Sequence, residues 1–499
     1  MEADVVMKTR IPSFPSLLLS FSVLASSVGC GGGEAPADGN DWNVLLVTLD
    51  TTRADRLSCY GYEVQTTPHL DRLAEDGVLF ERAISTAGIT PMSHSSILTG
   101  LNNYSHGMRV FYSDEVSHKL KDSVDTLPEI LARRGYKTAA CVSSYPVSEE
   151  YGLNQGFEHF TTGIDVEALD LKTQQKHAEF WVEGGSLNTQ RRGDLTVNDA
   201  ISWLDKEGEK GPWCMWVHLF DVHDYSLVPP LEYAKEFGIN AYPRGEVDGK
   251  SVEWREKMYD PEMRFQDAQV GRIFQWLRDK GLYDNTIVVV TADHGQGLKD
   301  GMQRHGWAKH RLLYDWSLHV PMIVKVPGMK PDQRVKNQVR TIDIVPTVLE
   351  ALNVPAKKPV EGESMLPLIR GEVETEARLA YAEALNMYDD HAPRRGMPEH
   401  SRNENLYMVS DGDWKMIFHR EREEHELFDL RNDPLELKNV ASDKPEVIAR
   451  LKTFLDERNA WRIEKPGDDG GDGPSEAALK GLGYGDDSDD DSDEEADED

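Results

Sequence analysis

The chain has 499 residues, 39% of them hydrophobic, so it can form one large α/β domain and a smaller second one. Its formal net charge is −33, and the segment 486–499 alone carries 11 acidic residues and no basic one. Without that segment the charge is −33 + 11 = −22, so the body is acidic too, which argues against nucleic-acid binding through a basic face. Residues 465–499 are too polar and charged to pack, and we predict a disordered acidic tail.

The N-terminus has the pattern of an export signal. Two basic residues precede an apolar stretch over 11–28, which Pro and Ser make too short and broken for a membrane span. The sequence "SVGC" resembles a bacterial lipobox, with Ser27 where Leu is usual, and a Gly-rich tether (31–41) follows Cys30. We predict a signal peptide over 1–30 and a protein of the bacterial periplasm or cell envelope, lipid-anchored through Cys30. A freely secreted protein, with its signal cut elsewhere, is the alternative.

Five apolar, β-branched runs predict buried strands, at 43–49, 138–142, 213–220, 286–290 and 320–326. The runs are continuous rather than alternating, which is typical of parallel strands covered on both faces. Helical segments lie between them, and Thr67 and Thr126 have the character of helix N-caps because a Pro follows within two residues. The alternation predicts a doubly wound, mostly parallel α/β sheet.

A second, smaller unit is predicted after a boundary near residue 375. The stretch 413–434 has a hairpin-like pattern, and a helix is expected over 444–459. The domains expected are therefore a main α/β domain over 42–375 and a small α+β subdomain over 376–464.

Three of the predicted strands lead into an aspartate: Asp50, Asp221 and Asp293. Open α/β sheets bind ligands outside the carboxyl ends of their strands, and three carboxylates gathered there would repel one another unless a cation lay between them. A single Asp could equally be a helix N-cap, but the three together favour a metal site. His294 directly follows Asp293, and His223 lies two residues after Asp221. Mixed Asp/His ligation suits Zn²⁺ or Mn²⁺, whereas an all-oxygen set would suit Ca²⁺ or Mg²⁺.

Several motifs together resemble the sulfatase family of the alkaline phosphatase superfamily. They include "NVLLVTLDTTRADRLSCYGY", "SSILTGLNNYSHG", "VHLFDVH", "VVVTADHGQGL" and "HGWAKHRLLYD", within a match that extends from about residue 42 to 484. The resemblance implies the fold, a divalent metal at the strand edge, an activated nucleophile, and a small-molecule or glycan ester as substrate. It places Asp50, Asp293 and His294 on metal-ligand positions. It also places His223, and either Lys309 or His310, where relatives contact the anion or the leaving group.

The stretch "ITPMSHSSILTG" (89–100) departs from the family pattern. Sulfatases oxidise a Cys or Ser within Cys/Ser-x-Pro-x-Arg to formylglycine, and counting back from "SILTG" places Thr90 there and His94 at the Arg position. Thr cannot be converted by that route, so we expect no formylglycine. Thr51 stands where sulfatases carry a further acidic metal ligand, and "CVSSY" (141–145) stands where relatives carry "GKWH", whose Lys and His grip the sulfate.

A Thr nucleophile is known in other branches of the superfamily, the nucleotide pyrophosphatase/phosphodiesterases and the phosphoethanolamine transferases. By that resemblance one metal would be bound by Asp50, Thr90, Asp293 and His294. For a second metal the residues available are Asp221, His223 and His310. One or two ions are thus expected, with Zn²⁺ or Mn²⁺ favoured and Ca²⁺ as the alternative.

The nucleophile candidate precedes a predicted helix whose N-cap is expected at Ser93. Helix amides favour a bound anion, and a metal would lower the pKa of the Thr90 hydroxyl. His94 could hydrogen-bond the anion in place of the family's Arg.

Three functions remain open from the sequence. The first is a sulfatase-family, metal-dependent hydrolase of sulfate or phosphate esters, with phosphodiester or phosphonate cleavage favoured by Thr90. The second is a transferase that moves a phospho-group to a cell-surface acceptor. The third is a non-catalytic relative that binds anions or glycans.

Overall fold

The computed structural model describes residues 41–164, 186–187, 189–223, 227–242, 251–390 and 397–463. The predicted signal peptide with Cys30, the tether up to residue 40 and the acidic tail lie outside these residues. Within the described part of the chain, no helix combines the length and apolar character that crossing a membrane requires.

The centre of the structure is a nine-stranded, mostly parallel sheet. Its strands follow the order β11-β2-β10-β8-β1-β7-β3-β4, and β9 also pairs with β2. Strand β1 lies near the middle and runs parallel to both β7 and β8. The strands are β1 (Asn43–Leu49), β2 (Val78–Ile84), β3 (Lys137–Val142), β4 (His159–Thr161), β7 (Trp213–Leu219), β8 (Thr286–Thr291), β9 (His319–Val320), β10 (Met322–Lys325) and β11 (Gln333–Arg340).

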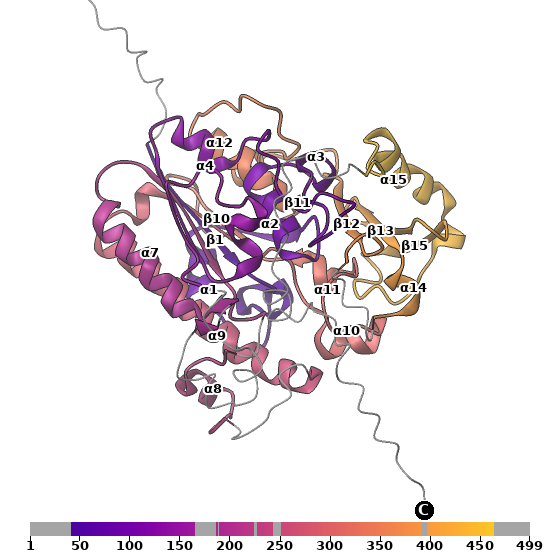
Figure 1. Cartoon of the computed structure of the whole chain (residues 1–499), viewed down its shortest axis with the longest axis horizontal. Coiled ribbons are helices and arrows are strands. Elements are labelled where there is room, and N and C mark those ends of the chain that lie inside the picture. Colours follow the sequence, from indigo (N-terminus) through magenta and orange to yellow (C-terminus); the bar gives the residue numbers. More distant parts are fainter. Residues whose placement is uncertain are drawn as a thin grey trace, which may run out of the picture. The chain divides into compact units, whose positions relative to one another are not determined.

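Both faces of this sheet are covered by helices, as Figure 1 shows. Along β1, Val44 and Leu46 pack into the apolar core on one face, whereas Leu45 and Val47 pack into the core on the other. This two-sided burial explains the continuous apolar runs, and it confirms the predicted doubly wound α/β fold. The first core includes residues of α2 (Thr90–Thr99), α4 (Leu127–Ala132) and α12 (Ile344–Ala351); the second includes residues of α1 (Pro68–Asp76), α7 (Gly193–Glu207) and α9 (Val252–Asp279).

The run 320–326 differs from the prediction in its direction. It forms β10 after a break at Pro321, and β10 is antiparallel to both of its neighbours, β8 and β2. An apolar run reports burial on both faces, but it carries no information on which way the strand runs. The mostly parallel sheet therefore contains an antiparallel strand next to its centre.

A separate four-stranded antiparallel sheet follows, with the order β12-β13-β14-β15 (Figure 1). The predicted hairpin is present as β14 and β15, and the predicted helix as α15 (Pro445–Glu457), which packs on β13 and β14. The strands are β12 (Ala380–Leu385), β13 (Asn405–Ser410), β14 (Trp414–His419) and β15 (Glu424–Asp429). The remaining α-helices and strands of the described residues are α3 (Asn103–His106), β5 (Ser186–Leu187), β6 (Gln190–Arg191), α8 (Leu231–Glu236), α10 (Leu298–His305), α11 (Asp315–Leu318), α13 (Leu366–Ile369) and α14 (Glu399–Arg402).

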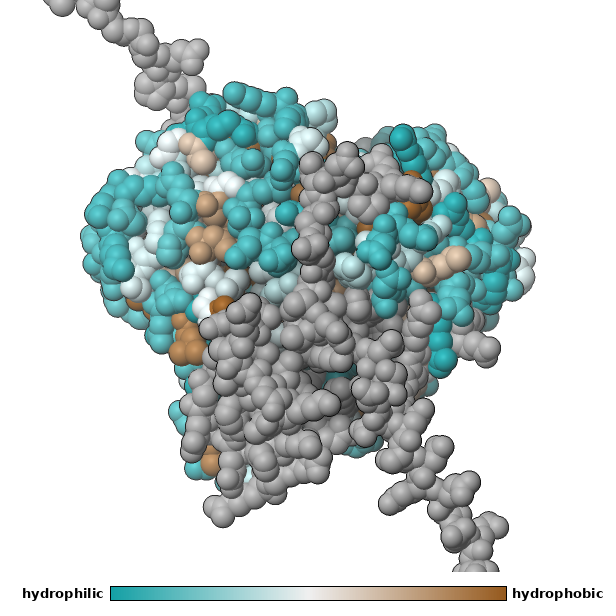
Figure 2. Space-filling model, in the orientation of Figure 1, coloured by the Kyte–Doolittle hydropathy of each residue, from teal (hydrophilic) through white to brown (hydrophobic). Residues whose placement is uncertain are grey.

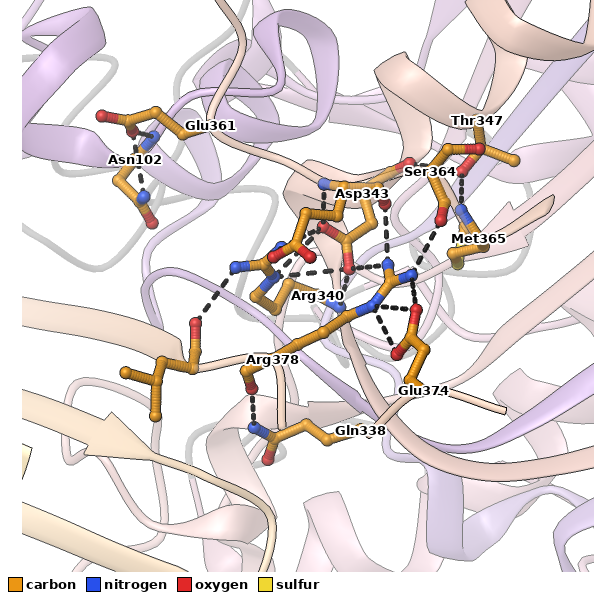
Figure 3. Close-up of polar contacts among 12 residues, drawn as sticks. Asn102, Gln338, Arg340, Asp343, Thr347, Glu361, Ser364, Met365, Glu374 and Arg378 are labelled. Atoms are coloured by element: carbon orange, nitrogen blue, oxygen red, sulfur yellow. Dashed lines mark hydrogen bonds and ion pairs between the residues drawn. The ribbon is translucent and has the colours of Figure 1, made fainter. Parts of the chain in front are cut away.

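A buried charge cluster links the end of β11 to the segment before β12 (Figure 3). The Asp343 carboxylate accepts hydrogen bonds from Arg340 Nη2 at 2.8 Å and Arg378 Nη1 at 2.9 Å, and from the Glu363 amide at 2.8 Å. Asp343 is fully buried, so its charge is compensated by these two guanidinium groups rather than by water.

Replacing Asp343 with Ala should destabilise the fold by about 3–5 kcal/mol, because two buried guanidinium groups lose their common partner. Urea unfolding measures this loss. Glu363→Gln is the matched control: Glu363 also pairs with Arg340, but its side chain is 61% exposed. It should cost at most about 1 kcal/mol. Equal losses in the two variants would contradict the role given to Asp343.

The face shown in Figure 2 is predominantly hydrophilic wherever it is drawn in colour. Large hydrophobic side chains exposed on the described residues are few, and Val373 is the most exposed of them.

Candidate active site

The carboxyl ends of β1 and β8 bring two aspartates and a histidine together. Asp50 directly follows β1, and Asp293 and His294 follow β8. Ligand atoms of these three residues all lie within 4.8 Å of one another, and the three side chains are buried. The Thr51 amide donates to Asp293 Oδ1 at 3.0 Å and the His294 amide donates to the same oxygen at 2.7 Å, so the backbone fixes the Asp293 carboxylate. Thr51 has φ 55°, an unusual conformation for a β-branched residue.

The electrostatics of this group favour a bound cation. Burial raises the pKa of Asp50 to about 6, although His294 lowers it, and burial followed by the neighbouring Asp50 raises the pKa of Asp293. Asp293 Oδ2 is buried and accepts no hydrogen bond. Two enclosed carboxylates, one with an unused oxygen, next to an imidazole form a donor set that fits a divalent metal.

Thr90 lies beside this group at the start of helix α2. Its Oγ1 is 3.3 Å from His294 Nε2. Because His294 Nδ1 is 3.0 Å from the Gly295 carbonyl, which can only accept, Nδ1 carries a hydrogen and Nε2 is the ring nitrogen that faces Thr90. The predicted N-cap at Ser93 is wrong: the helix begins at Thr90 with Ile89 as N-cap, and Ser93 Oγ donates to the Ile89 and Thr90 carbonyls.

His94 lies one turn after Thr90 on helix α2. Its Nδ1 donates to the Thr90 carbonyl at 2.8 Å, and its Nε2 is 3.0 Å from Thr48 Oγ1, to which the Trp216 indole donates. Burial lowers the pKa of His94 to about 3 despite the nearby Asp293, so the ring is neutral. Both nitrogens therefore have partners within the protein, and the ring braces the backbone of Thr90.

Two more of the predicted histidines lie around His294. The rings of His294 and His310 stack with 4.5 Å between their centroids, and the centroid of the His223 ring is 5.6 Å from that of His310. His310 Nδ1 donates to the Gly88 carbonyl at 2.6 Å, which fixes the ring. Burial lowers the pKa of both His223 and His310. Lys309 is half-buried, and its charge contributes to the lowered pKa of His223, so both residues left open by the motif spacing lie near the site.

Asp221, by contrast, is not brought to the group of Asp50. Its Oδ1 accepts the Gly193 amide at 2.8 Å, at the start of α7. The N-cap of α7 is Arg192, so Asp221 contacts a helix N-terminus without being the N-cap that a lone Asp could have been. Among the described residues, the one group with metal-ligand geometry is Asp50, Asp293 and His294. The arrangement thus provides one metal-capable centre, and the second set around Asp221 is not assembled.

Two buried residues near the site were not singled out from the sequence. His218 on β7 has its Nε2 3.1 Å from Asp50 Oδ2. Arg311 is fully buried with φ 119°, donates to Asp389 at 2.5 Å, and contributes to the lowered pKa of the adjacent His310. His218 stands within the apolar run 213–220 and Arg311 directly follows Lys309 and His310, and neither position reveals what the side chain faces. His106, in the "SHG" of the motif 95–107, is hydrogen-bonded to Ser96 and to the Met108 amide.

Sequence comparisons relate the chain to known sulfatases. The chain is 23% identical to the N-acetylglucosamine-6-O-sulfatase of Bacteroides thetaiotaomicron, over 91% of this chain and 92% of that protein. It is 25% identical to the arylsulfatase of Clostridium perfringens, over 81% and 90% of the two chains, and 29% identical to arylsulfatase K of Homo sapiens, over 83% and 81%.

Solved structures share the fold. One is a complex of a protein with its substrate D-glucosamine-2-N,6-O-disulfate, with a TM-score of 0.64 and 21% identity over 84% of this chain and 98% of that one. Another is the phosphonate monoester hydrolase of Agrobacterium radiobacter, with a TM-score of 0.61 and 20% identity over 85% and 97%.

Two family models match the chain. The model for the N-sulphoglucosamine sulphohydrolase C-terminal region matches residues 303–460, which include the four-stranded sheet and α15. The Sulfatase model matches residues 42–354, which hold the whole nine-stranded sheet and every residue of the candidate site. The chain therefore belongs to the sulfatase family, a family of enzymes that hydrolyse ester bonds.

Proposed function

We propose that this protein is a metal-dependent ester hydrolase that uses the Thr90 hydroxyl as its nucleophile, without formylglycine. The observation that carries the proposal is the position of Thr90 Oγ1, at the N-terminus of α2 and 3.3 Å from His294 Nε2 in the metal-capable group. Membership of the sulfatase family supports the reaction class, and the residue at the nucleophile position supports a hydroxyl attack.

The residues that would hold the metal are Asp50, Asp293 and His294, with Thr90 as a further ligand. A divalent cation there would lower the pKa of the Thr90 hydroxyl and stabilise charge that develops on the ester oxygen. The mixed donor set favours Zn²⁺ or Mn²⁺ over Ca²⁺. The geometry of the described residues supports a single ion, since Asp221 is held at the start of α7.

The chain's own groups position the attack. His94 holds the carbonyl of Thr90, and the N-terminal amides of α2 provide a favourable field for an anionic ester. We assign His223 and Lys309 to the anion or the departing group, with His310 orienting the ring of His294 through their stacked contact. The Thr90 hydroxyl releases a proton on attack and the departing oxygen takes one up, and the neutral rings of His223 and His310 can relay it between them.

The charges around the site favour a substrate that carries a single negative charge. The Asp50 and Asp293 carboxylates would offset one divalent cation, and His94 and His218 are both neutral because burial lowers the pKa of each to about 3. Lys309 is then the cationic group that we assign to the substrate anion. A phosphodiester, a phosphonate monoester and a sulfate ester are all monoanions, whereas a phosphate monoester is mostly a dianion at neutral pH. We favour the phosphodiester or phosphonate over the sulfate, because the segment 141–145 lacks the Lys and His with which sulfatases grip sulfate.

A panel of three aryl esters tests this assignment. We expect kcat/KM for a bis-aryl phosphate to exceed that for the aryl sulfate, and both to exceed that for the aryl phosphate monoester. The leaving group is the same in all three, so the ratios report recognition of the reacting centre. Rapid turnover of the aryl sulfate with no measurable phosphodiester cleavage would overturn the preference, while leaving the family assignment intact.

For localisation, we propose an exported protein of the bacterial cell envelope that is lipid-anchored through Cys30. The proposal rests on the signal pattern of the first 30 residues and on the "SVGC" sequence. Metabolic labelling with a fatty acid, compared with the Cys30→Ser variant, separates a lipid anchor from a cleaved secretory signal.

A further inference from the structure

A second buried histidine, His218, makes direct contact with the metal-capable group from the neighbouring strand β7. Its Nε2 is 3.1 Å from Asp50 Oδ2, and both side chains are fully buried. The contact follows from the sheet: β1 and β7 are parallel neighbours, with Thr48 beside His218, so a side chain on this face of β7 reaches the residue that follows β1.

The tautomer of His218 is set by the loop after β3. The Ser143 amide donates to His218 Nδ1 at 3.3 Å, so Nδ1 must be unprotonated and Nε2 must carry the hydrogen. Ser143 Oγ also donates to the His218 carbonyl at 2.8 Å and lies 2.6 Å from Thr196 Oγ1. The ring is thus held from the side opposite Asp50, and it can only donate to that carboxylate.

The Asp50 carboxylate is thereby restrained at both oxygens. Oδ1 accepts from the Thr51 hydroxyl at 2.6 Å, and Oδ2 accepts from His218. Each carboxylate oxygen has a further lone pair, which leaves capacity for a cation beside Asp293 and His294. Because two donors already restrain the Asp50 carboxylate, it loses less rotational freedom when a metal binds.

We propose that His218 is a positioning residue that sets the orientation of Asp50 for metal binding through the hydrogen bond from its Nε2, with Ser143 fixing its tautomer. The inference rests on the proposed metal at Asp50, Asp293 and His294. It concerns affinity for the metal rather than the chemical step. Loss of an outer-sphere partner of this kind weakens metal binding by about 10–100-fold.

The test measures Zn²⁺ and Mn²⁺ dissociation constants of the purified full chain by chelator competition, together with the melting temperature of the metal-free protein. His218→Phe keeps the ring but removes both nitrogens, and should weaken metal binding by about 10–100-fold. His218→Gln can place an N–H donor near the position of Nε2, and should stay within about threefold of wild type by the same reasoning. His218→Asn is too short to reach Asp50, and should resemble the Phe variant.

His106→Phe is the matched control. His106 is also fully buried, accepts a backbone amide at Nδ1 (from Met108, 3.1 Å) and has a hydroxyl partner at Nε2 (Ser96, 2.9 Å), but it is not part of the metal-capable group. It should lower the melting temperature without changing metal affinity.

Unchanged affinity in His218→Phe, or equal weakening in the Gln and Asn variants, would overturn the inference. If the Phe variant does not fold, the comparison of Gln with Asn decides. Wild-type protein that binds no metal at all would instead contradict the proposed function, so the two failures are distinguishable.

Discussion

Thr90→Ala should reduce kcat for a bis-aryl phosphate by on the order of 10⁴-fold or more, because the variant has no hydroxyl to attack the ester. The structure supports a specific loss. Thr90 Oγ1 contacts His294 Nε2, while the backbone of Thr90 is held independently through its carbonyl by His94. The variant should therefore fold and bind metal, and KM should change far less than kcat. Steady-state kinetics on metal-loaded enzyme, with melting curves, measure both quantities.

Two substitutions in the same turn make this result interpretable. Thr90→Ser keeps the hydroxyl and should retain activity within about tenfold of wild type, since only a methyl group is lost. Ser93→Ala removes a hydroxyl that donates only to the Ile89 and Thr90 carbonyls, and should leave kcat nearly unchanged. A Thr90→Ala enzyme that turns over at the wild-type rate would mean that a water molecule, not Thr90, is the nucleophile.

The pairing of Asp50 with Asp293 could be predicted from the sequence, because the direction of the two strands determines where both residues lie. Asp50 and Asp293 follow two apolar runs that form adjacent parallel strands, so their carboxylates must meet at one edge. Asp221 follows the third run in the same way, yet its carboxylate turns to the amide of Gly193. The path of the chain after a strand depends on the helix that packs there, and no pattern of apolar residues encodes it.

Two other differences have similar physical causes. A Ser before an apolar run is a strong N-cap signal and predicts that α2 starts after Ser93, but Pro91 is favoured in the first turn of a helix and indicates the earlier start that the structure has. The sequence pattern around His218 predicts only that this residue belongs to an apolar strand. Its function depends on the face it shares with Trp216 and on the neighbouring strand, and both become visible only when β1 and β7 are paired.

Asp293→Asn should abolish the metal-dependent gain in stability and lower kcat by about 10³-fold or more, because the metal contributes several kcal/mol to such reactions. The metal-free variant should nevertheless melt at a higher temperature than metal-free wild type at pH 8. Burial and the neighbouring Asp50 raise the pKa of Asp293, which means that its charged form is disfavoured in the folded state. Asn removes that charge, and its Oδ1 can still accept the Thr51 and His294 amides.

With metal bound, the wild type should be more stable than the Asp293→Asn variant. A cation at 1,000 times its dissociation constant stabilises the wild type by about 4 kcal/mol, whereas Asp293→Asn gains little. Asp221→Asn is the matched control, because Asp221 is also buried with a raised pKa, about 7, from burial, but lies outside the metal-capable group. The Asp221→Asn variant should keep the full metal-induced rise in melting temperature. A metal-free Asp293→Asn protein that melts below wild type would show that Asp293 is a structural carboxylate, and an Asp221→Asn protein without the metal shift would restore Asp221 as a ligand.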